Sequence, residues 1–166
     1  RELRTELERA GHRFYTASDT ETIVHAYEQW GEECFSRLRG MFGIALWDRR
    51  TRTLLLARDR AGIKPLYYTE HGSRLYFASE LKSLLAAGAV DGGIDIESLD
   101  HFLSFLYTPR DRAIFKGVSK LPPGHLLRWR DGRSELSAYW QISARETFIG
   151  SVDEAAEQLR GVLSSA

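Results

Sequence analysis

The sequence predicts an α+β fold in which largely antiparallel sheets stack on one another and helices cover their outer faces. Three observations lead to this prediction. Apolar residues recur at helical spacing near both ends of the chain and at strand spacing or in short runs between them. Polar turns separate neighbouring strand segments, which is typical of antiparallel hairpins. Residues 41–47 are apolar at nearly every position, as expected of a strand covered on both faces.

Length and composition restrict the functions that are open to the chain. Its 166 residues suffice for a domain with a sizeable core. The 23 Lys and Arg balance 23 Asp and Glu, so no overall field attracts nucleic acid or an anionic membrane, and neither is expected as a partner. No apolar run approaches the roughly 18 residues of a membrane span. The single cysteine, Cys34, excludes an internal disulfide and fits a cytoplasmic location.

Two helices are predicted near the beginning of the chain. The first covers the first ten residues, where Leu3 and Leu7 lie one helical turn apart among charges, and it ends at Gly11. The letters SDTE then match the capping-box pattern, in which Ser18 caps a second helix and Glu21 bonds back to the cap. Three polar side chains of this second helix are expected to face solvent: His25, Glu28 and Gln29.

Hairpins and shorter helices are predicted in the rest of the chain. "MFGIALWD" pairs with "TLLLA", "LYYT" pairs with "RLYFAS" around Gly72, and a third hairpin turns at residues 131–132, which are Asp-Gly. Helices are predicted over 80–87, 96–106 and 151–164. The apolar side chains of the helix over 96–106 are expected to face inward: Leu99, Phe102, Leu103 and Leu106.

Residue types alone reveal no catalytic apparatus. Cys34 and the histidines are scattered, and a buried, inert Cys34 is favoured over a dyad with His25. No histidines show the close paired spacing of a metal site, so no metal ligand is predicted within the chain. The glycine patterns of the common phosphate-binding loops are absent as well.

Two charged features leave alternatives open. Asp19 lies in the first turn of the second helix, where it complements the helix dipole and is also placed to accept from a ligand ammonium group. Arg58, Asp59 and Arg60 lie between two buried strands. They suit either a solvated turn or a structural salt bridge, because a buried arginine without a carboxylate partner would be costly.

The order of the segments resembles a known family. "SDTE", "LRGMFGIALWD", "LARDRAGIKPLYY", "LYFASELKSLL" and "LPPGHLL…YW" follow one another with compact spacing. Together they resemble the glutaminase domain of glutamine-hydrolysing asparagine synthetases, a class II glutamine amidotransferase among the N-terminal-nucleophile hydrolases. The resemblance implies a four-layer αββα sandwich, incomplete here, over residues 1–140. Residues 141–166 would then be a linker and the first helix of the synthetase domain.

The resemblance implies a reaction in two halves. Glutamine is hydrolysed to glutamate and ammonia, and the ammonia reaches an aspartate that ATP and Mg²⁺ have activated, giving asparagine. Glutamine, aspartate and ATP are therefore the expected ligands of the parent protein. A homodimer is a possible assembly of the parent. The nucleophile of the family is an N-terminal cysteine, and this chain begins with Arg1. Nucleophile and oxyanion-hole residues are expected upstream, the ATP-binding loop downstream, and the 166 residues alone are expected to be inactive.

One residue of the family's glutamine site is expected within the chain. Asp19 matches the aspartate that binds the α-ammonium group of glutamine. The resemblance implies a structural role near the site, with Arg58 and Asp59 as an internal pair, for six other residues: Ser18, Glu21, Arg58, Asp59, Gly62 and Pro65.

Two other functions stay open at this point. The parent protein can be a related ligase, similar to β-lactam synthetases, that uses the same domain with another acceptor. It can also be a degenerate, non-catalytic amidotransferase scaffold. Identification of the product formed with aspartate and ATP would test the first alternative, and a parent gene without a Cys immediately after its initiator Met would favour the second.

Overall fold

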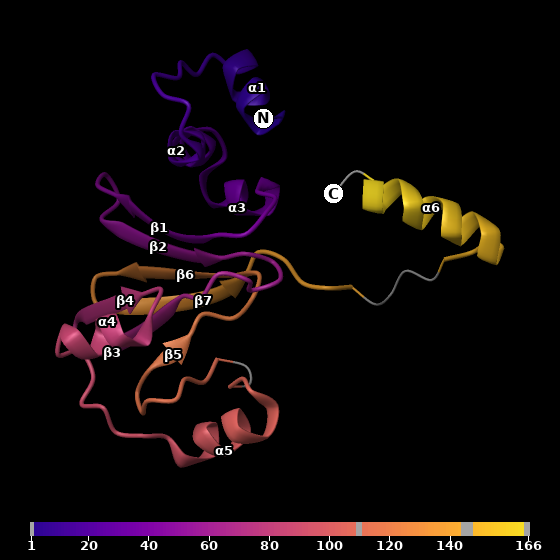
Figure 1. Ribbon diagram of the computed structural model, residues 1–166. Helices are drawn as coiled ribbons and strands as arrows, with labels where there is room; N and C mark the ends of the chain where they lie inside the picture. Colours follow the sequence, from indigo (N-terminus) through magenta and orange to yellow (C-terminus); the bar gives the residue numbers. More distant parts are fainter. Residues whose placement is uncertain (1, 109–110, 144–147, 165–166) are drawn as a thin grey trace.

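Two antiparallel sheets lie face to face with helices outside them, which confirms the predicted fold class (Figure 1). The computed structural model describes residues 2–108, 111–143 and 148–164. The first sheet has the order β1-β2-β6-β7, with the bounds Gly43–Asp48, Thr53–Arg58, His125–Arg130 and Arg133–Ala138. The second sheet has the order β4-β3-β5, with the bounds Arg74–Ala78, Tyr67–His71 and Ser119–Lys120.

Three helices near the N-terminus cover the outer face of the first sheet (Figure 1). They are α1 (Glu2–Arg9), α2 (Asp19–Trp30) and α3 (Cys34–Arg37), and a 3-10 turn, Gly31–Glu33, joins the last two. One core cluster joins helices and sheet; its fully buried members include Leu7, Ala26, Phe35, Leu55 and Ala57. The predicted helix over the first ten residues is thus confirmed, and Leu7 anchors it.

The second core cluster lies between the two sheets, where Leu56 and Leu127 meet Leu66 and Leu121. Strand β2 is buried on both faces because its side chains alternate between this cluster and the one under the helices. Strand β1 is not, so the prediction that 41–47 is covered on both faces is wrong. β1 is the edge strand of its sheet, and only its helix-facing side chains reach a core cluster.

A third cluster covers the outer face of the second sheet, where Leu84 of α4 (Leu81–Ala86) packs with Ala113 and Val118. This completes four layers in the order αββα. The helix predicted over 96–106 is present as α5 (Ile96–Phe105), but the prediction that its apolar side chains face inward is wrong, because Leu103 is 71% and Leu106 79% exposed. Polar links hold its N-terminal end instead: Arg112 binds Asp95, the N-cap, at 2.9 Å.

The last helix, α6 (Val152–Ser164), is present as predicted and has no buried residue within the described ranges. Part of the predicted linker, residues 144–147, lies outside those ranges. No helix in the described ranges has the length and apolar character needed to cross a membrane. The hairpin turns are confirmed: Gly72 has φ +58°, and Asp131 and Gly132 have φ +49° and +75°. Positive φ at both central residues is the pattern of a type I′ turn.

The junction between the sheets is held by Arg58, the last residue of β2, which is 7% exposed. Its guanidinium donates three hydrogen bonds to backbone carbonyls: Nε to Lys64 at 2.7 Å, Nη1 to Leu121 at 2.8 Å and Nη2 to Gly62 at 2.6 Å. Burial lowers the pKa of Arg58, and the nearby Asp59 charge opposes this shift. The guanidinium is therefore satisfied by carbonyl oxygens and not by a carboxylate.

Asp59 is 1% exposed and is likewise held by the backbone. Its carboxylate accepts from the N–H groups of Lys64 at 2.9 Å, Ile63 at 3.0 Å and Phe42 at 3.3 Å. Burial alone would raise the pKa of Asp59, but these bonds outweigh it and lower the pKa. The expected internal ion pair is absent among the described salt bridges, because each partner's polar atoms are engaged by main-chain groups.

Replacing Arg58 by Met should destabilise the protein strongly, because three carbonyls at the sheet junction lose their donors. The expected loss is about 3 kcal/mol or more of unfolding free energy, measured by denaturant unfolding. Arg49→Met is the matched control: the Arg49 side chain is exposed and makes no hydrogen bond or ion pair within the described ranges, so a change within about 0.5 kcal/mol is expected. Equal losses in both variants would contradict the role given to Arg58.

Gly62 cannot take a side chain without two separate costs. Its φ is +65°, and a Cβ would lie 2.7 Å from Pro123 Cγ and 3.2 Å from Arg58 Cζ. Gly62→Ala should cost about 1–2 kcal/mol for the backbone and about 1–3 kcal/mol for overpacking. Gly72→Ala is the control, because Gly72 has φ +58° with nothing within 4 Å of the added Cβ. Thermal unfolding that ranks the two variants equally would refute the steric cost at Gly62.

Candidate functional site

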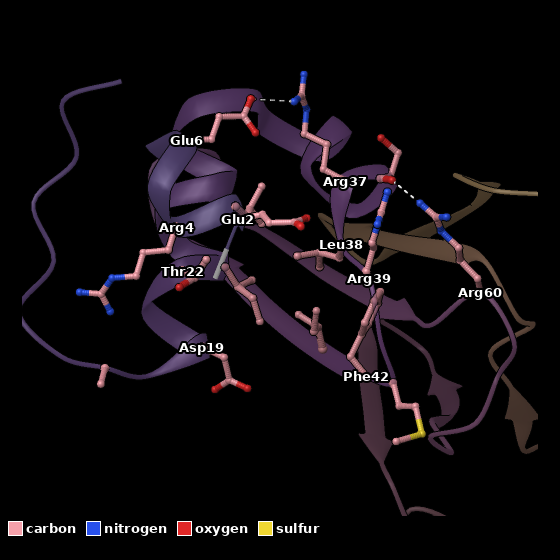
Figure 2. Close-up of a pocket in the computed structure, with 16 residues that line it drawn as sticks. Glu2, Arg4, Glu6, Asp19, Thr22, Arg37, Leu38, Arg39, Phe42 and Arg60 are labelled. Atoms are coloured by element: carbon pink, nitrogen blue, oxygen red, sulfur yellow. Dashed lines mark hydrogen bonds and ion pairs between the residues drawn. The ribbon is translucent and has the colours of Figure 1, made fainter. Parts of the chain in front are cut away.

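A cavity of about 1130 Å³ opens between the helix layer and the segment that leads into β1 (Figure 2). Helices α1 and α2 form one wall, residues 36–42 form the other, and Arg60 from the turn after β2 also lines the cavity. The apolar part of the lining comprises Leu3, Ile23, Leu38, Met41, Phe42 and Ile44. A second groove, of about 660 Å³, follows the exposed face of β1, and Asp19 lines both hollows.

Asp19 is the first residue of α2, and its side chain is exposed. Figure 2 shows its carboxylate projecting from the helix towards the open side of the cavity. The carboxylate makes no hydrogen bond or ion pair with any residue in the described ranges. The helix dipole favours negative charge at this position. Asp19 is therefore an ionisable acceptor with free lone pairs, which a ligand ammonium group can use.

The loop before Asp19 is fixed by Glu21, although not through the predicted capping box. Ser18 caps the helix by accepting from Thr20 N–H at 3.1 Å. Glu21 does not return to Ser18; it accepts from the N–H groups of Tyr15 and Thr16, both at 2.8 Å, and from the Thr16 hydroxyl at 2.5 Å. The Thr16 hydroxyl and the Tyr15 N–H together lower the pKa of Glu21 to about 2. Glu21 thus ties residues 15–16 to α2 and sets the direction in which Asp19 leaves the loop.

The arginines that line the cavity differ in their partners. Arg37 binds Glu6 at 3.2 Å, and Arg60 donates to the carbonyl of Ser36 at 2.5 Å (Figure 2). Arg39 is exposed, and its side chain makes no hydrogen bond or ion pair in the part of the chain that the structure describes. A free carboxylate and a free guanidinium on the same cavity suit a small ligand that carries both charges. Sequence reasoning missed Arg39, because nothing distinguishes it from the other exposed arginines.

The sole cysteine of the chain is unsuited to nucleophilic catalysis. Cys34 is fully buried in the cluster under the helices. Burial, assisted by the charge of Glu32, raises the pKa of its thiol to about 12. Because the thiolate is the reactive form, Cys34 is an inert core residue, as predicted.

The prediction that His25 faces solvent is wrong, and within the described ranges His25 makes no hydrogen bond to Cys34. Its side chain is only 16% exposed. Phe14 packs edge-on against the imidazole, with ring centroids 4.8 Å apart, and the ring of His12 lies 4.9 Å away. The helical spacing that placed His25 on the polar face could not show that the preceding loop folds over it.

The turn after β2 supports the site from behind. Arg60 lines the cavity, and Lys64 and Pro65 line the adjoining groove. Arg58, Asp59 and Gly62 do not line either hollow. The structure thus brings this turn close to Asp19, while the substrate role of Asp19 and the supporting roles of its neighbours stay predictions.

Comparison with protein families matches residues 1–140 to the glutamine amidotransferase domain. Asparagine synthetase [glutamine-hydrolyzing] 3 of Bacillus subtilis is 35% identical over 167 residues, which is 99% of this chain and 27% of that protein. Asparagine synthetase [glutamine-hydrolyzing] 1 of the same organism is 43% identical over 143 residues, covering 86% of this chain and 22% of that protein. Amidase chry2 of Gibberella zeae is 37% identical over 158 residues, covering 93% and 23%.

Among solved structures, the chain resembles the glutamine phosphoribosylpyrophosphate amidotransferase from B. subtilis complexed with ADP and GMP. The TM-score is 0.60 at 21% identity, with 85% of this chain and 27% of that chain covered. This likeness independently shows the same fold. The chain spans about a quarter of the length of the first curated relatives it matches.

Proposed function

Because the chain belongs to the family of glutamine amidotransferase domains, we propose that it forms part of the glutamine site of a glutamine-dependent asparagine synthetase. The observation that carries the proposal is the Asp19 carboxylate, which is unpaired within the described ranges at the mouth of a cavity. In this role Asp19 accepts charge-assisted hydrogen bonds from the α-ammonium group of glutamine. The dipole of α2 favours a negative charge at its first residue, and the Glu21 contacts hold the loop that aims the Asp19 side chain.

The site binds and orients the substrate, while the nucleophile comes from elsewhere. Hydrolysis of glutamine breaks the side-chain amide bond and gives glutamate and ammonia. A cysteine nucleophile for this step must be a thiolate near the substrate. Cys34 is buried in the core, so the proposal places the nucleophilic cysteine and the oxyanion-hole donors on residues other than these 166.

The second half of the proposed reaction uses the ammonia. It attacks an aspartate whose carboxyl group has been activated by ATP as an acyl-adenylate, giving asparagine and AMP. Mg²⁺ prefers oxygen ligands around phosphates. The residues described here do not fit ATP and Mg²⁺: the chain has no phosphate-binding glycine loop, and its candidate metal cluster in the described ranges contains two histidines. ATP and Mg²⁺ are therefore assigned to other parts of the parent protein.

A second candidate keeps the same glutamine site and changes the acceptor. It is favoured by the 37% identity with Amidase chry2 over 93% of this chain. The parent would then pass ammonia to a different activated carboxyl group. Product identification with aspartate and ATP decides between the two candidates, because asparagine forms only in the first.

Asp19→Asn in the full-length protein should impair glutamine use selectively, because the neutral amide loses the charge-assisted bonds to the substrate ammonium. The kcat/KM for glutamine is expected to fall by roughly 10–100-fold, while synthesis from added ammonium salts stays within about twofold. Asp153→Asn is the matched control: Asp153 also lies in the first turn of a helix, and no hollow lined by Asp19 includes it. Equal loss of both activities would show that Asp19 serves folding and not glutamine.

The 166 residues on their own should release no ammonia from glutamine, because the thiol they contain is buried and poorly ionised. The measurement is a coupled glutamate assay on the isolated chain beside the full-length protein. The assignment of the nucleophile to other residues would be contradicted if the isolated chain formed glutamate and the Cys34→Ser variant did not.

A further inference from the structure

Three side chains that can bind a metal ion lie together on α2 and the loop before it. None of them lines the cavity beside Asp19. His25 and Glu28 are three residues apart on one face of α2, and His12 reaches them from the connection between α1 and α2. We propose that His12, His25 and Glu28 form a binding site for a divalent transition-metal ion, with Zn²⁺ as the best fit. This inference does not depend on the proposed function.

The ligand atoms lie within about 0.6 Å of the separations that a tetrahedral ion requires. His12 Nδ1 is 3.2 Å from His25 Nδ1, His25 Nδ1 is 2.8 Å from Glu28 Oε2, and His12 Nδ1 is 3.7 Å from Glu28 Oε2. Zinc bonds of about 2.1 Å at tetrahedral angles put neighbouring ligands roughly 3.4 Å apart. The three observed distances bracket this value, so an ion can sit between the three atoms with small side-chain movements.

The remote nitrogen of each imidazole also faces an acceptor. A histidine that binds metal through Nδ1 carries its proton on Nε2, and that proton usually meets a carboxylate or carbonyl oxygen. Nε2 of His12 lies 3.0 Å from Gln29 Oε1. Nε2 of His25 lies 3.8 Å from Glu21 Oε1 and is buried without a hydrogen-bond partner in the described ranges. If the metal binds Nδ1 of His25, the ring proton is on Nε2. This N–H then points towards the carboxylate of Glu21.

Burial and donor chemistry select the kind of ion. The two histidine side chains are 17% and 16% exposed, whereas Glu28 is 54% exposed. Two imidazoles and one carboxylate are a zinc-type ligand set, and Mg²⁺ or Ca²⁺ would require mostly oxygen ligands. The exposed side at Glu28 leaves room for water as the fourth ligand. The site is therefore a partly open His₂Glu centre.

The ion would have a structural effect on the loop that leads to the cavity. It would fasten residue 12 to the middle of α2, and Glu21 fastens residues 15–16 to the beginning of the same helix. Asp19 is the first residue of α2 and comes three residues after the segment that Glu21 holds. Metal binding thus stabilises the connection between α1 and α2 without contacting the cavity that Asp19 lines.

The test uses the full-length protein, stripped with a chelator and titrated with ZnCl₂ in excess Mg²⁺. Calorimetry should show a Zn²⁺ site that raises the thermal midpoint, because ligand binding to the native state stabilises it. Glu28→Gln and His12→Gln should weaken this site by at least roughly tenfold. His101→Gln is the control, because His101 stacks on Phe105 at 6.0 Å and takes no part in the cluster; it should bind Zn²⁺ like the unaltered protein.

Co²⁺ supplies a second measurement that does not depend on stability. In the unaltered protein and in His101→Gln, Co²⁺ should give the strong visible absorption of a tetrahedral site, and Glu28→Gln should lose it. Glu28 is exposed, so this variant should fold even if His12→Gln does not. Absence of a Zn²⁺ site in the unaltered protein, or equal affinity in Glu28→Gln and His101→Gln, would overturn the proposal and leave only a hydrogen-bonded pair of imidazoles.

Discussion

A buried positive charge without a counter-ion in contact holds the two sheets together at one corner. Arg58 ends a strand of the first sheet, and its guanidinium reaches a carbonyl that follows a strand of the second, at Leu121. Burying a guanidinium is costly unless its donors are satisfied. Here backbone oxygens satisfy them, so the chain must keep three carbonyls pointing inward at this corner. The charge therefore dictates the path of the backbone from residue 62 to residue 64.

The same corner organises segments that are far apart in the sequence. The hydroxyl of Tyr139 donates to the carbonyl of Arg58 at 2.6 Å, and the carbonyl of Asp59 accepts from Gly124 N–H at 3.0 Å. Asp59 also binds the N–H of Phe42, which lines the cavity. The end of the last hairpin, the connection between the sheets and the wall of the cavity thus share one hydrogen-bonded junction. These bonds link the backbone of Phe42, and with it one wall of the cavity, to the corner where the two sheets meet.

Local patterns predicted what local forces decide. Hairpin turns and helix positions follow from residues close in the sequence, and the structure has both where they were predicted. The sequence did not predict that one face of β1 and the apolar side chains of α5 are exposed. Periodicity shows which residues share an apolar face, but it does not show whether another element packs on that face. The capping motif shows the same limit. Ser151 and Glu154 form a reciprocal capping box, in which Glu154 N–H donates to Ser151 Oγ at 3.2 Å and Ser151 N–H donates to the Glu154 carboxylate at 2.7 Å. At Ser18 the box does not form, because the Glu21 carboxylate accepts from Thr16 instead.

The candidate site was predictable in part. Asp19 followed from the order of family-like segments, and the cavity beside it agrees with that prediction without testing its role. The three carbonyl partners of Arg58 were not predictable, because main-chain acceptors leave no mark on residue identity. The convergence of His12 and His25 was missed because thirteen residues separate them and close spacing was the criterion. Both cases depend on how a loop folds back, which no periodic pattern encodes.

The depth of Cys34 has a practical meaning for any labelling of the intact protein. With a pKa of about 12, its thiolate is scarce at neutral pH, and the surrounding core shields it from reagents. Thiol-directed electrophiles and disulfide exchange will therefore leave the thiol of Cys34 largely unmodified. A cysteine-directed signal from the parent protein can then be attributed to thiols outside these residues. Cys34 therefore adds little to a thiol-labelling signal, so a reactive cysteine elsewhere in the parent protein can be detected without first removing Cys34.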